Sequence, residues 1–356
     1  MEDSKDILGE IKKEPYSIQK EEKKEEDKQI KIESKLEKTK EESIEEKKGE
    51  IIAVYLDNIK SLYIIKKIFE NINTKKLLEL VKYNKKIKNR LDISLNNYKE
   101  YSEKYSKIEI EVIPGGKGGK FININNKKEE EYFHVYFNNN KEEKSKSLLP
   151  EYLVRMKIKI KIVIDPEIKS LKNLFYKCRG IEEVNFKKCY RNNITDISRM
   201  FYGCEFLQKI NFSNFNTENV TDMSGMFDEC HSLLELNLSN FNTKNVTDMS
   251  YMFDKCFSLL ELNLSNFNTI HVKSINSMFG YCEKIKTLDL SNFRTDNITE
   301  MICLFIGCHS LQDVNLPNFE NYKKIDMTSM FSKCSNQLRK KISAENKNLI
   351  RVAFSD

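Results

Sequence analysis

The chain has 356 residues, 39% of them hydrophobic, and a net charge of +6 that remains from 60 basic and 54 acidic residues. This length and composition allow two or three domains with packed cores, and the near balance of charge does not indicate a nucleic-acid partner. The first residues lack the cationic and apolar parts of a signal peptide, and no run approaches the roughly 18 apolar residues of a membrane span. We therefore expect a cytoplasmic protein, with the cell surface or secretion as the alternative.

Residues 1–50 are dominated by lysine and glutamate, with isolated apolar residues that keep no heptad. Such a segment buries too little apolar surface to offset its ordering entropy, which predicts a disordered tail. Apolar residues at helical spacing then predict two helices between Ile51 and Leu91. Next, IEIEV at 108–112, a glycine-rich turn at 114–120, and the runs FININ and EYFHVYF predict strands that pair back on one another. Residues 51–150 are thus expected to form a small α+β domain.

The run VRMKIKIKIVI at 154–164 alternates apolar residues with Arg155, Lys157, Lys159 and Lys161. The pattern predicts a strand whose basic side is a solvated face, and a site for phosphate or an acidic protein is the alternative. Because this strand falls at the position of a repeat strand, we expect it to cap the N-terminal end of the repeat array that follows.

Seven cysteines recur every 26 residues, and each is preceded three residues earlier by phenylalanine. The cysteines are Cys178, Cys204, Cys230, Cys256, Cys282, Cys308 and Cys334. A fixed period of this length indicates one structural unit stacked on copies of itself. Adjacent cysteines of such a stack would be about 5 Å apart, which does not exclude disulfides, but a recurring small buried side chain is the expected role.

Each repeat divides into two halves. Apolar residues three, six and eight places after the cysteine, such as Leu233, Leu236 and Leu238, predict a short strand, and stacked copies predict a parallel sheet. In the second half, the spacing of Val246 and Met249 with the following phenylalanine and cysteine predicts one stripe of a short helix. The expected fold class is an α/β repeat solenoid over 151–340, closed by a C-terminal cap at 341–356.

The repeat L-x-x-L-N-L-S-N-F-N-T-x-N-V-T-D-M-S-x-M-F-x-x-C resembles that of the BspA-like leucine-rich-repeat surface proteins, particularly the branch found in mycoplasma lipoproteins. The resemblance covers about residues 165–340. It implies a curved, leucine-rich-repeat-like solenoid with a parallel sheet on its concave side, used for binding proteins.

Strand positions that point away from the core are the ones most available for recognition. Five and seven places after the cysteine, acidic and amide side chains predominate, and we expect them to bind a partner on the concave face. They are Glu183, Asn185, Glu235, Asn237, Glu261, Asn263, Asp289, Asp313 and Asn315. Such a face suits a basic peptide or protein surface. The alternative is that these residues are merely solvated.

Catalytic residues are not apparent. The four histidines have no metal-ligand spacing, and no serine lies in a nucleophile elbow. We therefore expect a non-enzymatic interaction scaffold without cofactor or metal. Residues 62–91 loosely resemble an F-box, which gives a substrate adaptor of a ubiquitin ligase as one alternative function, and a surface adhesin is another.

Overall fold

The structure is a computed structural model that describes residues 85–91, 94, 96, 100, 103–116, 118–124, 126–138, 140, 142–144, 148–317, 324–345 and 353. The chain divides into two compact units, Met1–Lys99 and Glu100–Asp356. In the first unit the described residues include α4 (Lys85–Arg90), which falls within the second predicted helix. The predictions for the charged tail, the first helix and most of the F-box-like segment lie outside the described residues.

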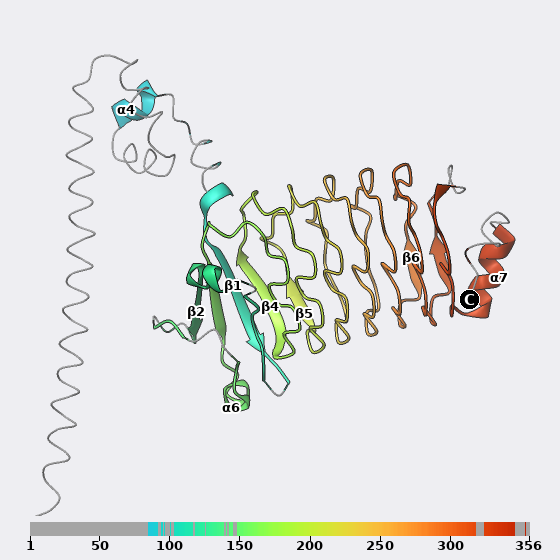
Figure 1. Ribbon diagram of the computed structural model, residues 1–356, viewed down its shortest axis with the longest axis horizontal. Helices are drawn as coiled ribbons and strands as arrows, with labels where there is room; N and C mark the ends of the chain where they lie inside the picture. Colours follow the sequence, from blue (N-terminus) through green and yellow to red (C-terminus); the bar gives the residue numbers. More distant parts are fainter. Residues whose placement is uncertain are drawn as a thin grey trace, which may run out of the picture. The chain divides into compact units, whose positions relative to one another are not determined.

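The second unit begins with a five-stranded sheet (Figure 1). Its strand order is β2-β3-β1-β4-β5, and every pair in it is antiparallel except β4–β5. The strands are β1 (Ile108–Pro114), β2 (Phe133–Phe137), β3 (Ile160–Ile164), β4 (Ile181–Lys188) and β5 (Lys209–Asn211). A separate parallel pair is formed by β6 (Thr287–Asp289) and β7 (Asp313–Asn315). The helices are the 3-10 helix η1 (Lys127–Tyr132), α6 (Glu151–Arg155) and α7 (Asn336–Glu345).

The predicted α/β solenoid with a parallel sheet is wrong. The largest sheet is mostly antiparallel, and parallel pairing in named strands is limited to β4–β5 and β6–β7. Among the described residues of the repeats, the second half contains no helix and is a run of tight turns. Successive repeats nevertheless lie against one another, since isolated parallel bridges join Asp196 to Asp222 and Asp222 to Asp248, a step of 26 residues each time.

The turns replace the expected helix for a local reason. In the repeat that ends at Cys256, the amide N–H of Met252 donates to the Met249 carbonyl, and that of Cys256 donates to the Phe253 carbonyl. The third residue of each turn has a positive φ, 59° at Tyr251 and 55° at Lys255. Left-handed residues interrupt an α-helix and suit a turn of this type. Other N–H groups of these turns donate to the next repeat, as Phe253 does to the Met278 carbonyl at 2.9 Å.

The core of the repeats is a ladder of phenylalanine rings. Phe227, Phe253 and Phe279 are fully buried, with centroids 5.7 and 5.8 Å apart and planes within 10° of parallel. Beside them the cysteine thiols donate to carbonyl groups of the preceding repeat, for example Cys256 Sγ to the Phe227 oxygen at 3.2 Å. The apolar ladders predicted from the sequence are therefore core, as expected.

All nine cysteines are free, and all except the half-buried Cys303 are buried. Burial raises the pKa of the Cys256 thiol well above its ordinary value, and it raises the pKa of Cys303 as well. Because the thiolate is the reactive form, we expect native protein to react with a thiol reagent slowly, with Cys303 modified first and the others only after denaturant is added. Mass spectrometry of partly labelled protein would measure this order. Rapid native labelling of the ladder cysteines would contradict it.

The predicted cap strand at 154–164 forms only in part, and it does not lie beside the first repeat strand. Strand β3 begins at Ile160, and the segment before it forms α6 and a turn rather than the start of a strand. It does not pair with the first repeat strand, because β1 lies between β3 and β4 and is antiparallel to both. Residues about 50 positions apart in the sequence, such as Ile110 and Ile162, are thus neighbours in one sheet.

The predicted pairing of β1 with the run at 121–125 is also wrong. After Pro114 the glycine-rich turn does not lead back along β1. Instead, Gly119 forms an antiparallel bridge with Leu149. Gly118 has φ +81°, and a Cβ there would stand 2.5 Å from the Leu149 carbonyl oxygen. Only glycine fits so close an approach, which explains the local glycine content. Phe121 then enters the core instead of a strand.

No described helix is both long and apolar enough to cross a membrane.

Candidate partner-binding surface

The outward positions of the repeat strands form a groove, here called the strand-face groove. It is lined by residues four and five places after successive cysteines: Glu183, Gln208, Lys209, Leu234, Glu235, Leu260 and Glu261. In β5, β6 and β7 the strand begins at the fifth place with an exposed residue that is followed by a buried one, and the fourth place lies just before the strand. Inward leucines and isoleucines fix the backbone, and the residues between them are free to vary.

The floor of the groove carries exposed apolar side chains. Leu234 is 46% exposed and Leu260 is 53% exposed, and their repeats are adjacent, with the amide N–H of Leu260 donating to the Leu234 carbonyl at 3.1 Å. Phe206, in the preceding repeat, is exposed as well. Scattered exposed leucines are common, but a neighbouring pair inside a groove is a feature of contact surfaces.

Unpaired carboxylates flank these leucines. Glu183, Glu235 and Glu261 are exposed and make no ion pair or hydrogen bond in the described part of the chain. Lys209 stands beside Glu183 in the parallel β4–β5 register, which leaves a net charge of −2 over these four residues. The groove therefore joins an apolar floor to a negative rim.

The other residues predicted for this face have different surroundings. The side chains of Asn237, Asn263 and Asp289 accept the backbone N–H two residues on, at 2.9–3.0 Å, so they shape the turn after the strand. This hydrogen bond from the Ser291 N–H lowers the pKa of Asp289. Asp313 forms an ion pair of 2.7 Å with Lys341 of α7. Asn185 is half-buried on β4, and Asn315 is exposed on β7.

Sequence reasoning thus found the acidic rim and missed the apolar floor. The sequence did contain a signal for these leucines, because Leu234 and Leu260 occupy a position where other copies have Gln208, Lys286 or Gln312. A pair of leucines at an outward position has no role in packing the core. The contrast between these leucines and the polar residues of the other copies therefore indicates a contact surface.

The predicted basic strand face is a network of ion pairs. Lys161 of β3 lies 3.0 Å from Glu109 of β1, and Lys188 of β4 lies 2.7 Å from the same carboxylate. The hydrogen bond from Lys188 is the largest cause of the lowered pKa of Glu109. Lys159 approaches Glu111 at 3.8 Å. Of the four predicted basic residues, Lys159 and Lys161 thus pair with glutamates of β1, which fits a solvated strand face, whereas Arg155 lies on α6.

Residues 169–345 match a sequence model of the family described as Mycoplasma protein of unknown function, DUF285, in two overlapping segments, 169–283 and 234–345. This supports the Mycoplasma-type repeat family that the motif indicated, and it does not distinguish a leucine-rich-repeat surface-protein branch within it. Comparisons with curated proteins and with solved structures returned no match.

Proposed function

We propose that the repeats form a non-enzymatic protein-binding module that holds a peptide segment of basic and apolar residues in the strand-face groove. One observation supports this best: Leu234 and Leu260 are exposed side by side, and the unpaired carboxylates of Glu235 and Glu261 stand next to them. Apolar side chains of the segment would cover the leucines, and its lysine or arginine side chains would meet the carboxylates.

The two parts of the groove would contribute differently. Removing the leucines from water supplies affinity, whereas the exposed carboxylates chiefly raise the rate of association and fix orientation. The groove is shallow and spans few residues, so we expect micromolar rather than nanomolar dissociation constants. The nine free thiols suit a reducing compartment, and we propose a cytoplasmic location.

A defined peptide tests the proposal. The full chain is titrated with a twelve-residue peptide of alternating leucine and lysine pairs, and with two matched peptides in which glutamate replaces lysine or serine replaces leucine. We expect binding of the first peptide alone. The double variants Glu235→Lys/Glu261→Lys and Leu234→Ser/Leu260→Ser should each weaken it at least about tenfold, since both remove contacts from the centre of the groove.

The matched control is Glu218→Lys/Asp296→Lys, which makes the same charge change at two exposed positions outside the groove. It should leave peptide affinity within about twofold, because neither side chain lines the groove and salt screens exposed charges that make no contact. Equal loss in the control and the groove variants would mean that net charge, not the groove, attracts the peptide. No loss in either groove variant would place binding elsewhere.

A further inference from the structure

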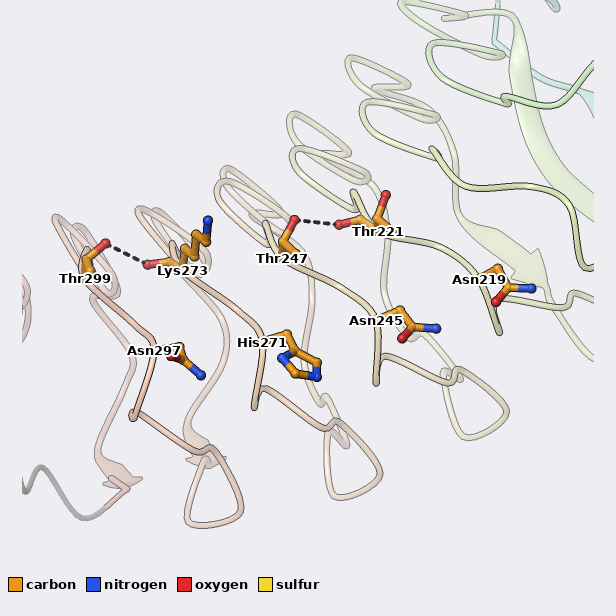
Figure 2. Close-up of a pocket in the computed structure, with 8 residues that line it drawn as sticks. All are labelled: Asn219, Thr221, Asn245, Thr247, His271, Lys273, Asn297 and Thr299. Carbon is orange, nitrogen blue, oxygen red and sulfur yellow. Dashed lines mark hydrogen bonds between the residues drawn. The ribbon is translucent and has the colours of Figure 1, made fainter.

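A second groove crosses four repeats, and all eight residues that line it have polar or charged side chains. Figure 2 shows its lining as two rows, one of Asn219, Asn245, His271 and Asn297 and the other of Thr221, Thr247, Lys273 and Thr299. The residue between each pair is buried, as Val246 is. Backbone hydrogen bonds of 2.8–2.9 Å join successive members of the second row. Equivalent side chains in adjacent repeats are therefore about 5 Å apart, and the four repeats span about 15 Å.

In the consensus repeats these side chains hold the stack together. Asn245 Nδ2 donates to the Glu218 carbonyl at 2.8 Å, and Thr247 Oγ1 donates to the Thr221 carbonyl at 3.1 Å. Asn219, Asn297 and Thr299 make the equivalent bonds. An N-x-T sequence at this place therefore has a structural explanation.

One repeat departs from this pattern at three positions. His271 stands where the other three have asparagine, Lys273 where they have threonine, and Ser274 where two of them have aspartate and the third has glutamate. Neither the His271 ring nor the Lys273 ammonium has a hydrogen bond or ion pair within the described residues, so this repeat gives up two hydrogen bonds to its neighbour. The change to Lys273 makes the local charge more positive, and the change to Ser274 makes it less negative.

None of the charged side chains nearby forms an ion pair with Lys273 within the described residues. Lys244 pairs with Glu218 at 3.6 Å, and Arg294 pairs with Asp296 at 3.1 Å. Glu300 accepts the Asn276 side-chain N–H at 2.7 Å. A repeat that loses structural contacts and gains unpaired donors, in the middle of a groove, has the signature of a functional rather than a packing position.

From this juxtaposition we propose that the groove binds an acidic oligosaccharide, with Lys273 and His271 holding a carboxylate or sulfate of the sugar. The Lys273 ammonium supplies the charge, and the imidazole supplies a ring N–H in either tautomer. On both sides, asparagine oxygens and threonine hydroxyls face the sugar hydroxyls. No aromatic side chain lines the groove, which disfavours stacked nucleic-acid bases, and a single lysine is too little for a phosphate backbone.

The test compares three tetrasaccharides on the full chain: a carboxylated hyaluronate fragment, a sulfated heparin fragment, and neutral cellotetraose, with inorganic sulfate as a fourth ligand. We expect one or both acidic tetrasaccharides to bind in the range of about 0.1 to 1 mM, and cellotetraose and sulfate to bind at least about tenfold more weakly. Which acidic fragment binds better identifies the anionic group.

The decisive variant is His271→Asn/Lys273→Thr, which restores the consensus repeat and so keeps the fold. It should lower the affinity for the acidic tetrasaccharide at least about tenfold. The control Lys244→Thr, which removes an exposed lysine of the preceding repeat, should change that affinity by less than about twofold. The proposal is overturned if the consensus variant binds as well as the natural chain. It is equally overturned if sulfate binds as tightly as the saccharides, or if neither acidic fragment binds at millimolar concentration.

Discussion

Replacing Phe253 with alanine should lower the free energy of unfolding by about 3 to 5 kcal/mol, which for most domains is a large part of the total. The ring is fully buried and stacked on both sides, at 5.7 Å from Phe227 and 5.8 Å from Phe279. Removing it deletes burial and leaves a cavity between two rings that are held by their own repeats and cannot close over it. Chemical denaturation of the purified variant gives the measurement.

The matched position is Phe331 in the last repeat. Its ring stacks on one described neighbour, Phe305 at 5.2 Å, and its backbone N–H donates to the Ala353 carbonyl rather than to a further repeat. A stack opens most easily at its end, so Phe331→Ala should cost distinctly less than Phe253→Ala. Equal costs at the two positions would argue against a ladder in which each repeat is stabilised by both neighbours.

The sequence predicted packing far better than backbone pairing. The period of 26 and the recurrence of cysteine and phenylalanine identified the buried positions, because burial depends on a pattern that one repeat shows by itself. Pairing of β1 with β3 and β4 depends on contacts between Ile110 and residues more than 50 positions away, Ile162 and Phe186. No local pattern records such contacts, so the antiparallel sheet could not be predicted.

The helix predicted for the second half of the repeat failed for a different reason. Spacings of three, four and three residues between Val246, Met249, Phe253 and Cys256 suit one face of a helix, but they suit a succession of β-turns equally. The hydrogen bond from the Ser250 N–H to the Asp248 side chain at 2.8 Å favours the turn. Aspartate followed two residues later by serine was the local signal that was missed.

The strand-face groove likewise contains residues that the sequence predicted and residues that it did not. Outward glutamates such as Glu235 were predictable from alternation alone. The neighbouring exposed leucines were not recognised, because most leucines of these repeats are core residues and a leucine is at first assigned to the core. Both proposed sites lie where exposed positions depart from the repeat consensus, as at Leu234 and at Lys273.

Two buried carboxyl groups should make stability depend on pH. Asp228 and Asp254 lie in adjacent repeats, are 8% and 7% exposed, and each has an Oδ1 atom without a hydrogen-bond partner in the described structure. Burial is the main cause that raises the pKa of Asp228 to about 7 and that of Asp254 to about 6, and the negative charge of Asp254 contributes to the first. Lys255 opposes both shifts, but it also pairs with Glu229 at 3.0 Å.

The sign follows from proton binding. A carboxyl whose pKa is higher in the folded state binds its proton more tightly there, so its contribution to stability is complete below about pH 4 and is lost as pH rises through 6 and 7. The carboxylates with lowered pKa, such as Glu109 and Asp165, act oppositely and only in more acidic solution. We therefore expect the free energy of unfolding to fall between pH 5 and pH 8.

Asp228→Asn isolates this effect, because the amide is nearly the same size and carries no charge. At pH 8 it should raise the free energy of unfolding by on the order of 2 to 4 kcal/mol, and at pH 4, close to the ordinary pKa that the carboxyl has in the unfolded chain, it should change little. Asp248→Asn is the control, since Asp248 is only half-buried and accepts the Ser250 N–H through an oxygen that asparagine retains, so no gain is expected at either pH. Denaturation of the three proteins at both pH values gives the comparison, in which titration of the histidines cancels. If Asp228→Asn were less stable than the natural chain at pH 8, the carboxylate would have a favourable partner, and the pH dependence would have another origin.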